Sequence, residues 1–280
     1  METTVIFVVL GSAVLHAVWN AIIKSGPDKL LETMLKACGG GVIALVSLFF
    51  VPFPTLGAWK CLGMTMCIHF FYYTFIAYAY RGSDLGYAYT IMRGSAPLLT
   101  ALGSVFILGE PLASSGWIGI VALSSGVLIL AIDAICRGGF SLSVTCLALG
   151  NAVIIMGYSL VDGTGVRLAE TVASYICWAS FLNFFPITIF SLIVRGREKW
   201  SAYIKARWHY GLFGGACSLL AYGLALWGMT RAPIAAVAAL RETSVVFGML
   251  FGVFFLKETI TPARVAAVLL VLAGAMVMRF

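Results

Sequence analysis

Long apolar stretches follow one another along the whole chain, separated only by short segments that carry proline, glycine or charge. A bilayer core about 30 Å thick needs roughly 20 apolar residues for each helical span, so 280 residues leave room for about ten spans. Barrel strands would instead alternate in segments of about ten residues. The pattern therefore predicts an all-α polytopic membrane protein. We expect its spans near residues 3–23, 30–51, 60–80, 86–108, 113–133, 143–168, 171–194, 210–230, 234–256 and 261–279.

Composition excludes the other classes. Hydrophobic residues make up 61% of the chain and charged residues only 10%, against about 25% charged in soluble domains. Disordered chains are excluded because they are charged and poor in aromatic residues. The first apolar run, Val5 to Ile23, lacks a basic segment before it and a small-residue cleavage pattern after it, so we expect a retained span and not a signal peptide. The seven cysteines form no CxxC pair, and we predict no metal and no cofactor.

Unusual residues recur in the same order in the two halves of the chain. Leu10–Val14 returns as Leu149–Val153. Further matches are Trp19 with Tyr158, Cys67 with Cys217, Tyr72 with Tyr222, Arg81 with Arg231, Arg93 with Arg241, Leu108 with Leu256, Glu110 with Glu258 and Gly126 with Gly274. Each half then holds five spans, and an odd number of spans turns the second half upside down. We predict two inverted five-helix repeats, residues 1–137 and 138–280, a geometry suited to alternating access around a central cavity.

The distribution of Lys and Arg predicts the orientation in the membrane. With the N-terminus on one side, that side receives 4 basic residues and the other receives 12, five of them in the polar stretch Arg195–His209. Cytoplasmic loops carry the excess of basic residues. The count therefore places both termini outside. The net charge of +7 follows from these loops and does not indicate nucleic acid as a partner.

Several motifs resemble those of EamA-type transporters, in the drug/metabolite transporter superfamily. The first half contributes Tyr80–Leu85, Arg93, Pro97 and Leu108–Glu110, and the second half contributes Arg231–Pro233, Ala239–Glu242 and Leu256–Glu258. His16–Asn20 and Tyr158–Gly163 look like the first-span and sixth-span signatures of one bacterial branch. The chain departs from the family at Lys257, where glycine is more common. Members are commonly drawn with both termini in the cytoplasm, and here we follow the charge count instead.

The resemblance implies a secondary transporter that moves small metabolites, often amino acids or related anionic or zwitterionic compounds, and commonly outward. It places the chain in a bacterial inner membrane, with the lipid bilayer and a small-molecule substrate as partners. Two alternatives stay open: an uncoupled facilitator or channel, and a membrane protein of the phosphonate-utilisation type. We predict no enzyme, because the chain has no HExxH, GxSxG or P-loop motif and His16, His69 and His209 are isolated in sequence.

Arg93 and Arg241 are the strongest candidates for substrate binding. Each lies about seven residues into its span, roughly 10 Å at 1.5 Å per residue, and so within about 5 Å of the bilayer midplane. A guanidinium at that depth is costly unless it is paired or hydrated. One interpretation is that both line a cavity and capture a carboxylate or another anion. The other is a structural ion pair.

Polar and aromatic residues of other spans are further candidates for the cavity wall. His16, Trp19 and Asn20 share one helical face and could either line the cavity or make interhelical hydrogen bonds. The side chains that could stack on a substrate are Tyr72, Tyr158, Tyr222 and Trp227.

Acidic residues inside the spans are the candidates for coupling to protons. Glu242 follows Arg241 but points to another face of the helix, so it could carry protons or pair with Arg93. Asp162 lies nearer a span end, where an interfacial role is as plausible as coupling. We expect Glu110 and Glu258 to have structural roles at the ends of their spans.

Overall fold

The computed structural model of the chain describes residues 1–79, 85–136, 140–256 and 261–278. Its regular elements within these ranges are all helical. The helices are α1 (Thr3–Ser25), α2 (Lys29–Ser47), η1 (Leu48–Phe50), α3 (Leu56–Ala79), α4 (Leu85–Leu108), α5 (Ser114–Ala134), α6 (Leu142–Leu168), α7 (Val172–Arg195), α8 (Arg197–Met229), α9 (Ile234–Arg241), α10 (Ser244–Leu256) and α11 (Pro262–Val277). Arg81, Arg137, Lys257, Glu258 and Arg279, used in the sequence analysis, lie outside the described residues.

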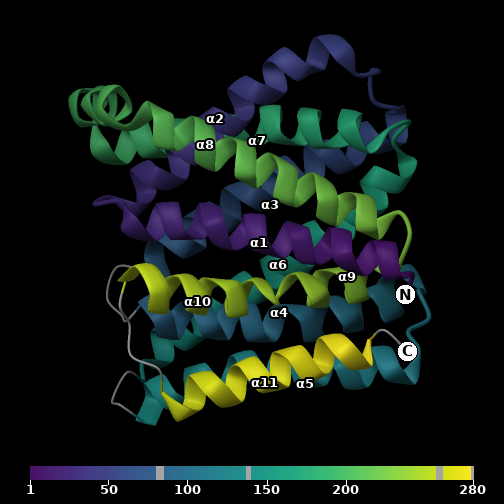
Figure 1. The fold of residues 1–280 in the computed structure, drawn as a ribbon. Helices are drawn as coiled ribbons and strands as arrows, with labels where there is room; N and C mark the ends of the chain where they lie inside the picture. The colour runs from purple at the N-terminus through teal and green to yellow at the C-terminus, as the bar shows by residue number, and fades with distance from the viewer. Residues whose placement is uncertain (80–84, 137–139, 257–260, 279–280) are drawn as a thin grey trace.

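The helices run back and forth along one common direction, and both termini lie at the same end of the molecule (Figure 1). Eight segments of the described chain are long and apolar enough to cross a membrane, with α9 and the first part of α10 counted as one. Helices α3 and α11 run alongside them. The prediction of an all-α, multi-pass membrane protein is confirmed, and the arrangement as ten spans in two repeats stays a prediction.

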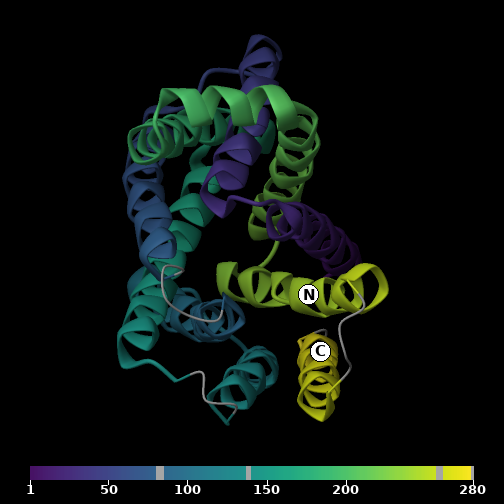
Figure 2. The same cartoon turned by 90° about the vertical axis from the view of Figure 1, so that its left-hand side faces the viewer.

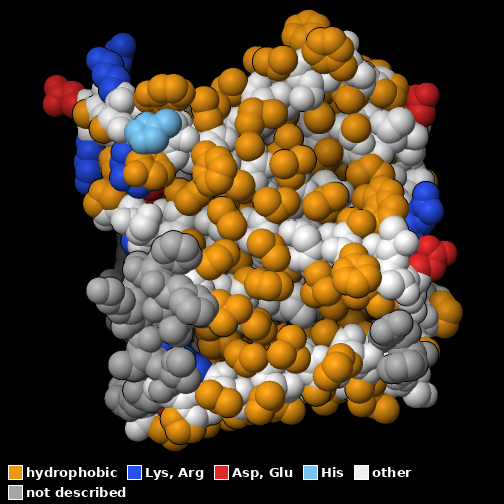
Figure 3. All heavy atoms as spheres, in the orientation of Figure 1, with side chains coloured by type: hydrophobic (Ala, Val, Ile, Leu, Met, Phe, Trp, Pro, Cys, Tyr) orange, Lys and Arg blue, Asp and Glu red, His pale blue; other side chains and the backbone are white. Residues whose placement is uncertain are grey.

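The outer surface is suited to lipid and not to water. Hydrophobic side chains cover the middle of the face in Figure 3, whereas Lys and Arg gather mainly at the end opposite the termini. Phe49, Phe50 and Phe106 are each more than 80% exposed. Exposed phenylalanines are favourable in a hydrocarbon environment, and helices satisfy their backbone hydrogen bonds internally, as a bilayer core requires.

Two pairs of helices approach so closely that only glycine fits. At the α2–α8 crossing, a Cβ added to Gly39 would lie 2.0 Å from the Gly211 carbonyl oxygen, and one added to Gly215 would lie 2.2 Å from the Gly40 nitrogen. The α5–α11 pair at the edge of the molecule (Figure 2) has a similar crossing at Gly119 and Gly274. Small residues allow such close helix contacts in membranes.

Gly248 and Gly252 lie four residues apart in the ninth predicted span and match Thr100 and Ser104 of the fourth, a small-residue pattern that predicts a close helix contact. A Cβ added to Gly248 meets no atom within 4 Å, so the small-residue seam expected there is wrong at Gly248. Its predicted partner Gly252 lies outside the residues whose side chains are described. The matching residues Thr100 and Ser104 of α4 are buried, as a packing role requires.

The ninth predicted span, 234–256, is broken after Arg241. Helix α9 ends there and α10 begins at Ser244, with Glu242 and Thr243 in a turn. The Thr243 hydroxyl donates to the Leu240 carbonyl at 2.8 Å, a local bond that competes with continued helix. The predicted span therefore consists of two helices, joined by a turn at Glu242 and Thr243 whose side chains are buried.

The polar stretch from Arg195 to His209 is also different from the prediction. It is helical and forms the beginning of α8, separated from α7 only by Gly196 with a φ of 76°. Measured along its path at 1.5 Å per residue, the 33-residue helix α8 is about 50 Å long, more than a hydrocarbon core of about 30 Å, and Figure 2 shows that it bends between its first turns and the rest. Its basic first turns therefore lie beyond the apolar zone. Helices α4 and α7 contain Pro97 and Pro186 in their interiors.

Candidate functional site

A cavity of about 130 Å³ lies between helices of both halves of the chain. This is room for several water molecules, each of which needs about 10–15 Å³. Its polar and aromatic lining residues are His16, Trp19, Lys36, His69, Tyr72, Arg93, Tyr158, Ser180, Asn183, Phe184, Ser218, Tyr222 and Arg241. Of the nine residues predicted to bind substrate, seven line this cavity and Asn20 and Trp227 do not.

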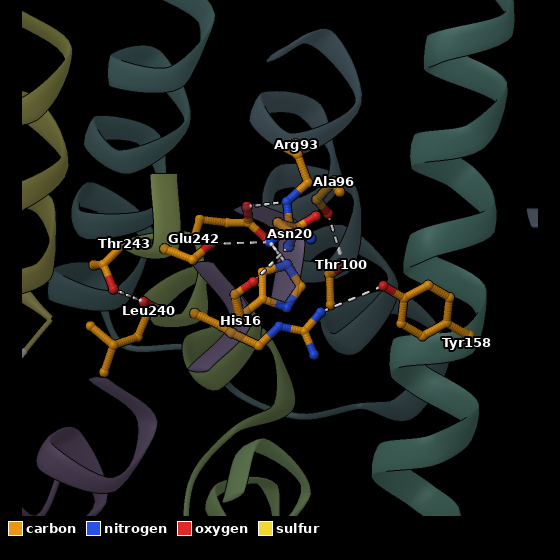
Figure 4. Close-up of polar contacts among 11 residues, drawn as sticks. His16, Asn20, Arg93, Ala96, Thr100, Tyr158, Leu240, Glu242 and Thr243 are labelled. Carbon is orange, nitrogen blue, oxygen red and sulfur yellow. Dashed lines mark hydrogen bonds and ion pairs between the residues drawn. The ribbon is translucent and has the colours of Figure 1, made fainter. Parts of the chain in front are cut away.

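Arg93 lines the cavity and is also part of an ion pair. Its Nε lies 2.8 Å from Glu242 Oε2, although the angle is off that of a hydrogen bond. Its Nη2 lies 3.1 Å from His16 Nε2 and donates to Ser244 Oγ at 3.4 Å. Figure 4 shows this cluster at the break between α9 and α10. Arg93 therefore both lines the cavity and contacts the carboxylate of Glu242.

Arg241 has a different environment. It is only 4% exposed, yet no carboxylate of the described residues lies within ion-pair distance. Its Nη2 donates to the Tyr158 hydroxyl at 3.5 Å (Figure 4), and its guanidinium carbon lies 5.6 Å from the centre of the Tyr222 ring. Its buried Nε has no hydrogen-bond partner. A buried guanidinium held only by neutral and aromatic groups retains capacity for an anion.

The first-span motif divides between the cavity and its own helix. The rings of His16 and Trp19 meet edge to face at 4.7 Å, and both line the cavity. The Asn20 amide turns back and donates to the His16 carbonyl at 2.7 Å, so it does not contribute to the cavity wall as expected. An amide that bonds to its own helix satisfies itself locally.

Stacked aromatic rings form one side of the cavity. Tyr158 contacts Tyr72 at 5.9 Å, Tyr222 at 6.4 Å and His69 at 4.9 Å between ring centres. These are the edge-to-face and tilted geometries that aromatic pairs prefer. Trp227 is not in this group. It lies beneath the Arg231 guanidinium at 5.4 Å, near the end of α8, so its predicted place in the cavity is not supported by the geometry.

Asp162 is fully buried behind the aromatic wall. Its carboxylate accepts hydrogen bonds from the Tyr222 hydroxyl at 2.5 Å, the Tyr175 hydroxyl at 2.7 Å and the Thr65 hydroxyl at 3.0 Å. Thr65 Oγ1 in turn lies 3.1 Å from His69 Nδ1. Asp162 lies in the last third of α6, which ends at Leu168, and its side chain is buried among neighbouring helices.

Lys36 and Asn183 belong to the cavity but were missed by sequence reasoning. Lys36 was counted only as an orientation charge, although it lies seven residues inside the apolar run of α2, which is the signal that could have revealed it. Its Nζ lies 4.7 Å over the Trp19 ring. Asn183 of α7 is a single amide in an apolar helix, and its relation to α2 and α8 appears only in the folded chain.

Ion pairs tie the two halves together at both ends of the molecule. At the end with the termini, Arg167 of α6 pairs with Glu110, which also accepts from the Ile234 amide at 3.1 Å and from Ser104 at 2.6 Å. Burial opposes ionisation, but these hydrogen bonds hold the pKa of Glu110 below its ordinary value of 4.5. At the other end, Arg195 lies 2.8 Å from Asp28. Glu110 has the structural role expected of it.

Comparison with known proteins agrees with these features. Residues 142–280 match the EamA-like transporter family. Over 275 residues the chain is 26% identical to a protein of Salmonella typhimurium (strain LT2) named "Probable amino-acid metabolite efflux pump", with 92% of this chain and 89% of that protein covered. A solved structure described only as "Crystal structure of protein" has a TM-score of 0.76 at 19% identity, over 99% of this chain and 96% of that one, and shows the fold alone.

The apolar helices and these similarities define the class of the protein: a multi-pass integral membrane transporter. More particularly, its second half, residues 142–280, matches the EamA-like transporter family. The comparisons point to transport rather than catalysis, and the bacterial relative fits a bacterial inner membrane.

Proposed function

We propose that this protein is a secondary transporter that exports small anionic or zwitterionic metabolites, such as amino acids, by alternating access around the cavity. The name of the Salmonella relative supports amino-acid metabolites as the class and efflux as the direction. The single observation that carries the proposal is Arg241, a buried guanidinium in the cavity wall without a carboxylate partner among the described residues. An anionic substrate group would complete its coordination.

The two repeats, residues 1–137 and 138–280, are part of the proposal. Helix contacts support them. If α1 corresponds to α6 and α3 to α8, the contact of α1 with α8 has its counterpart in the contact of α6 with α3, and both contacts are present. The contacts of α2 with α7 and of α5 with α11 join corresponding helices directly. The equivalent arginines Arg93 and Arg241 also meet at one cavity. Such symmetry provides two exchangeable packings around one site.

Protons are the proposed coupling ions, and the two acidic candidates differ in their surroundings. Glu242 contacts Arg93, which lines the cavity. Asp162 contacts Tyr222, which also lines the cavity. Either carboxylate can therefore sense substrate through one intermediate side chain. Counterflow at clamped internal and external pH, compared with uptake driven by a pH gradient, tests whether protons are coupled at all.

The test of the proposed function is counterflow in proteoliposomes loaded with a panel of amino acids, carboxylates and phosphonates. We expect saturable exchange by the wild-type protein. Arg241→Gln is expected to abolish it, whereas Arg197→Gln, at an exposed arginine of α8, leaves it unchanged. Normal exchange by a well-expressed Arg241→Gln protein would contradict the role of the cavity. Flux that never saturates would indicate a facilitator or channel in place of a carrier.

A further inference from the structure

Lys36 is a second cation in the cavity wall without an acidic partner. Its stem passes over Gly214 of α8, where an added Cβ would lie 3.9 Å from the Lys36 Cγ, and its ammonium lies over the Trp19 ring. No carboxylate of the described residues lies within ion-pair distance of Lys36 or of Arg241. The cavity therefore has two separate groups that can each receive an anionic group.

The charges around the cavity do not balance. Among the described residues, Lys36, Arg93 and Arg241 line it, and the carboxylates in contact with its lining are Glu242, paired with Arg93, and Asp162, bonded to Tyr222. When the histidines are neutral and both carboxylates are ionised, these groups carry three positive and two negative charges, so their net charge is +1. An uncompensated charge at membrane depth is costly. A ligand with one net negative charge would remove that cost, whereas a neutral zwitterion would not.

A third polar group faces the cavity without a partner. Asn183 of α7 lines the cavity, and its buried Oδ1 accepts no hydrogen bond from the residues that the structure describes. An unsatisfied buried carbonyl oxygen costs about 1–3 kcal/mol, which a ligand donor can recover. Tyr72 and Tyr158 line the same cavity, and aromatic rings attract cations. The site can therefore also accept an ammonium group.

We propose that the preferred ligand is an acidic amino acid: two anionic groups, one for Lys36 and one for Arg241, and an ammonium group for Asn183. The inference rests on the proposed function and narrows its substrate class. Lys36 is then the residue that separates acidic amino acids from neutral ones of the same size. Arg241 binds the anionic group that both kinds of ligand share.

The test is counterflow in proteoliposomes with three probes: L-glutamate, L-glutamine and glutarate. The wild-type protein is expected to have an affinity for L-glutamate at least tenfold higher than its affinity for L-glutamine, which lacks one negative charge. Lys36→Gln is expected to reduce the affinity for L-glutamate about tenfold and leave that for L-glutamine unchanged. Lys205→Gln, at an exposed lysine of α8, is the matched control. Asn183→Leu is expected to lower the affinity for L-glutamate but not the affinity for glutarate, because glutarate has no ammonium group.

The outcomes separate this inference from the proposed function. Equal exchange of L-glutamate and L-glutamine by the wild-type protein would overturn the inference and leave the proposed transporter standing. An equal loss of affinity for L-glutamate and L-glutamine in a normally expressed Lys36→Gln protein would also overturn it. Absence of saturable exchange for these probes and for the whole panel would remove the proposed function together with the inference.

Discussion

The guanidinium of Arg93 lies 2.8 Å from the carboxylate of Glu242, and this contact joins α4 to the break between α9 and α10. Both side chains are about 5% exposed or less. One partner comes from the first half of the chain and the other from the second. The pair therefore holds together, beside the cavity, two helices that are distant in sequence.

Removal of one partner of this pair should destabilise the protein strongly. Glu242→Gln leaves Arg93 buried without its counter-charge, and we expect a loss of about 3–5 kcal/mol, the typical cost of breaking a buried ion pair. Thermal unfolding in detergent measures the effect. The double variant Arg93→Met, Glu242→Met should be more stable than Glu242→Gln, because it leaves no buried charge. A double variant that is less stable would show that the pair itself provides net stability.

Tyr222 and Tyr175 both donate to Asp162, but only Tyr222 lines the cavity. Each Tyr→Phe substitution removes one hydrogen bond to a buried carboxylate, at a cost of about 1.5–3 kcal/mol of stability. We expect Tyr222→Phe also to weaken substrate affinity, and Tyr175→Phe to leave it unchanged. Counterflow and thermal unfolding, measured on the same preparations, separate the two effects. Equal losses of affinity would contradict the assignment of Tyr222 to the site.

The glycine crossing of α2 and α8 should not tolerate a methyl group. The Cβ of Gly215→Ala would lie 2.2 Å from the Gly40 backbone nitrogen, so the helices must separate. We expect a loss of about 1–3 kcal/mol or more, as for other overpacked sites. Gly11→Ala is the matched control, since its Cβ meets no atom within 4 Å and the substitution should stabilise α1 by about 0.5–1 kcal/mol. A stable Gly215→Ala protein would contradict this crossing.

The link at Glu110 should make stability depend on pH in the acid range. Its folded pKa lies below the ordinary value of 4.5, so its contribution is fully present above that value and is lost as the pH falls through the folded pKa. Glu110→Gln should therefore lower the melting temperature at pH 7, and the difference from the wild type should shrink below about pH 4.5. Glu170→Gln, at an exposed glutamate near the same end, is the control. A difference that does not change with pH would contradict the ionised link.

Much of the fold could be predicted from the sequence. Apolar runs of about twenty residues predict helices because a bilayer allows few other structures. The break after Arg241 could not be predicted with the same certainty. A run such as Ala235–Ala239 favours helix. Whether Glu242 can be buried in a turn after this run depends on Arg93, which is distant in sequence and supplies the compensating charge.

The candidate site was predictable only in part. Arg93, Arg241 and the tyrosines were conspicuous because polar and aromatic groups are unusual at membrane depth. Trp227 and Asn20 have the same residue types but face elsewhere, towards Arg231 and towards the backbone of α1. Residue type identifies candidates, and helix rotation decides which of them reach the cavity.

What the sequence by itself determined is the class of the structure: apolar helices in a bilayer, a recurring set of residues in two halves, and charged groups at unusual depth. These follow from local composition and from the cost of exposing polar backbone to lipid. Only the tertiary structure decided that Glu242 compensates Arg93 while Arg241 and Lys36 have no acidic partner among the described residues. Partnership between charges depends on distances of a few ångströms between helices, and those distances are set by packing at positions such as Gly39 and Gly215.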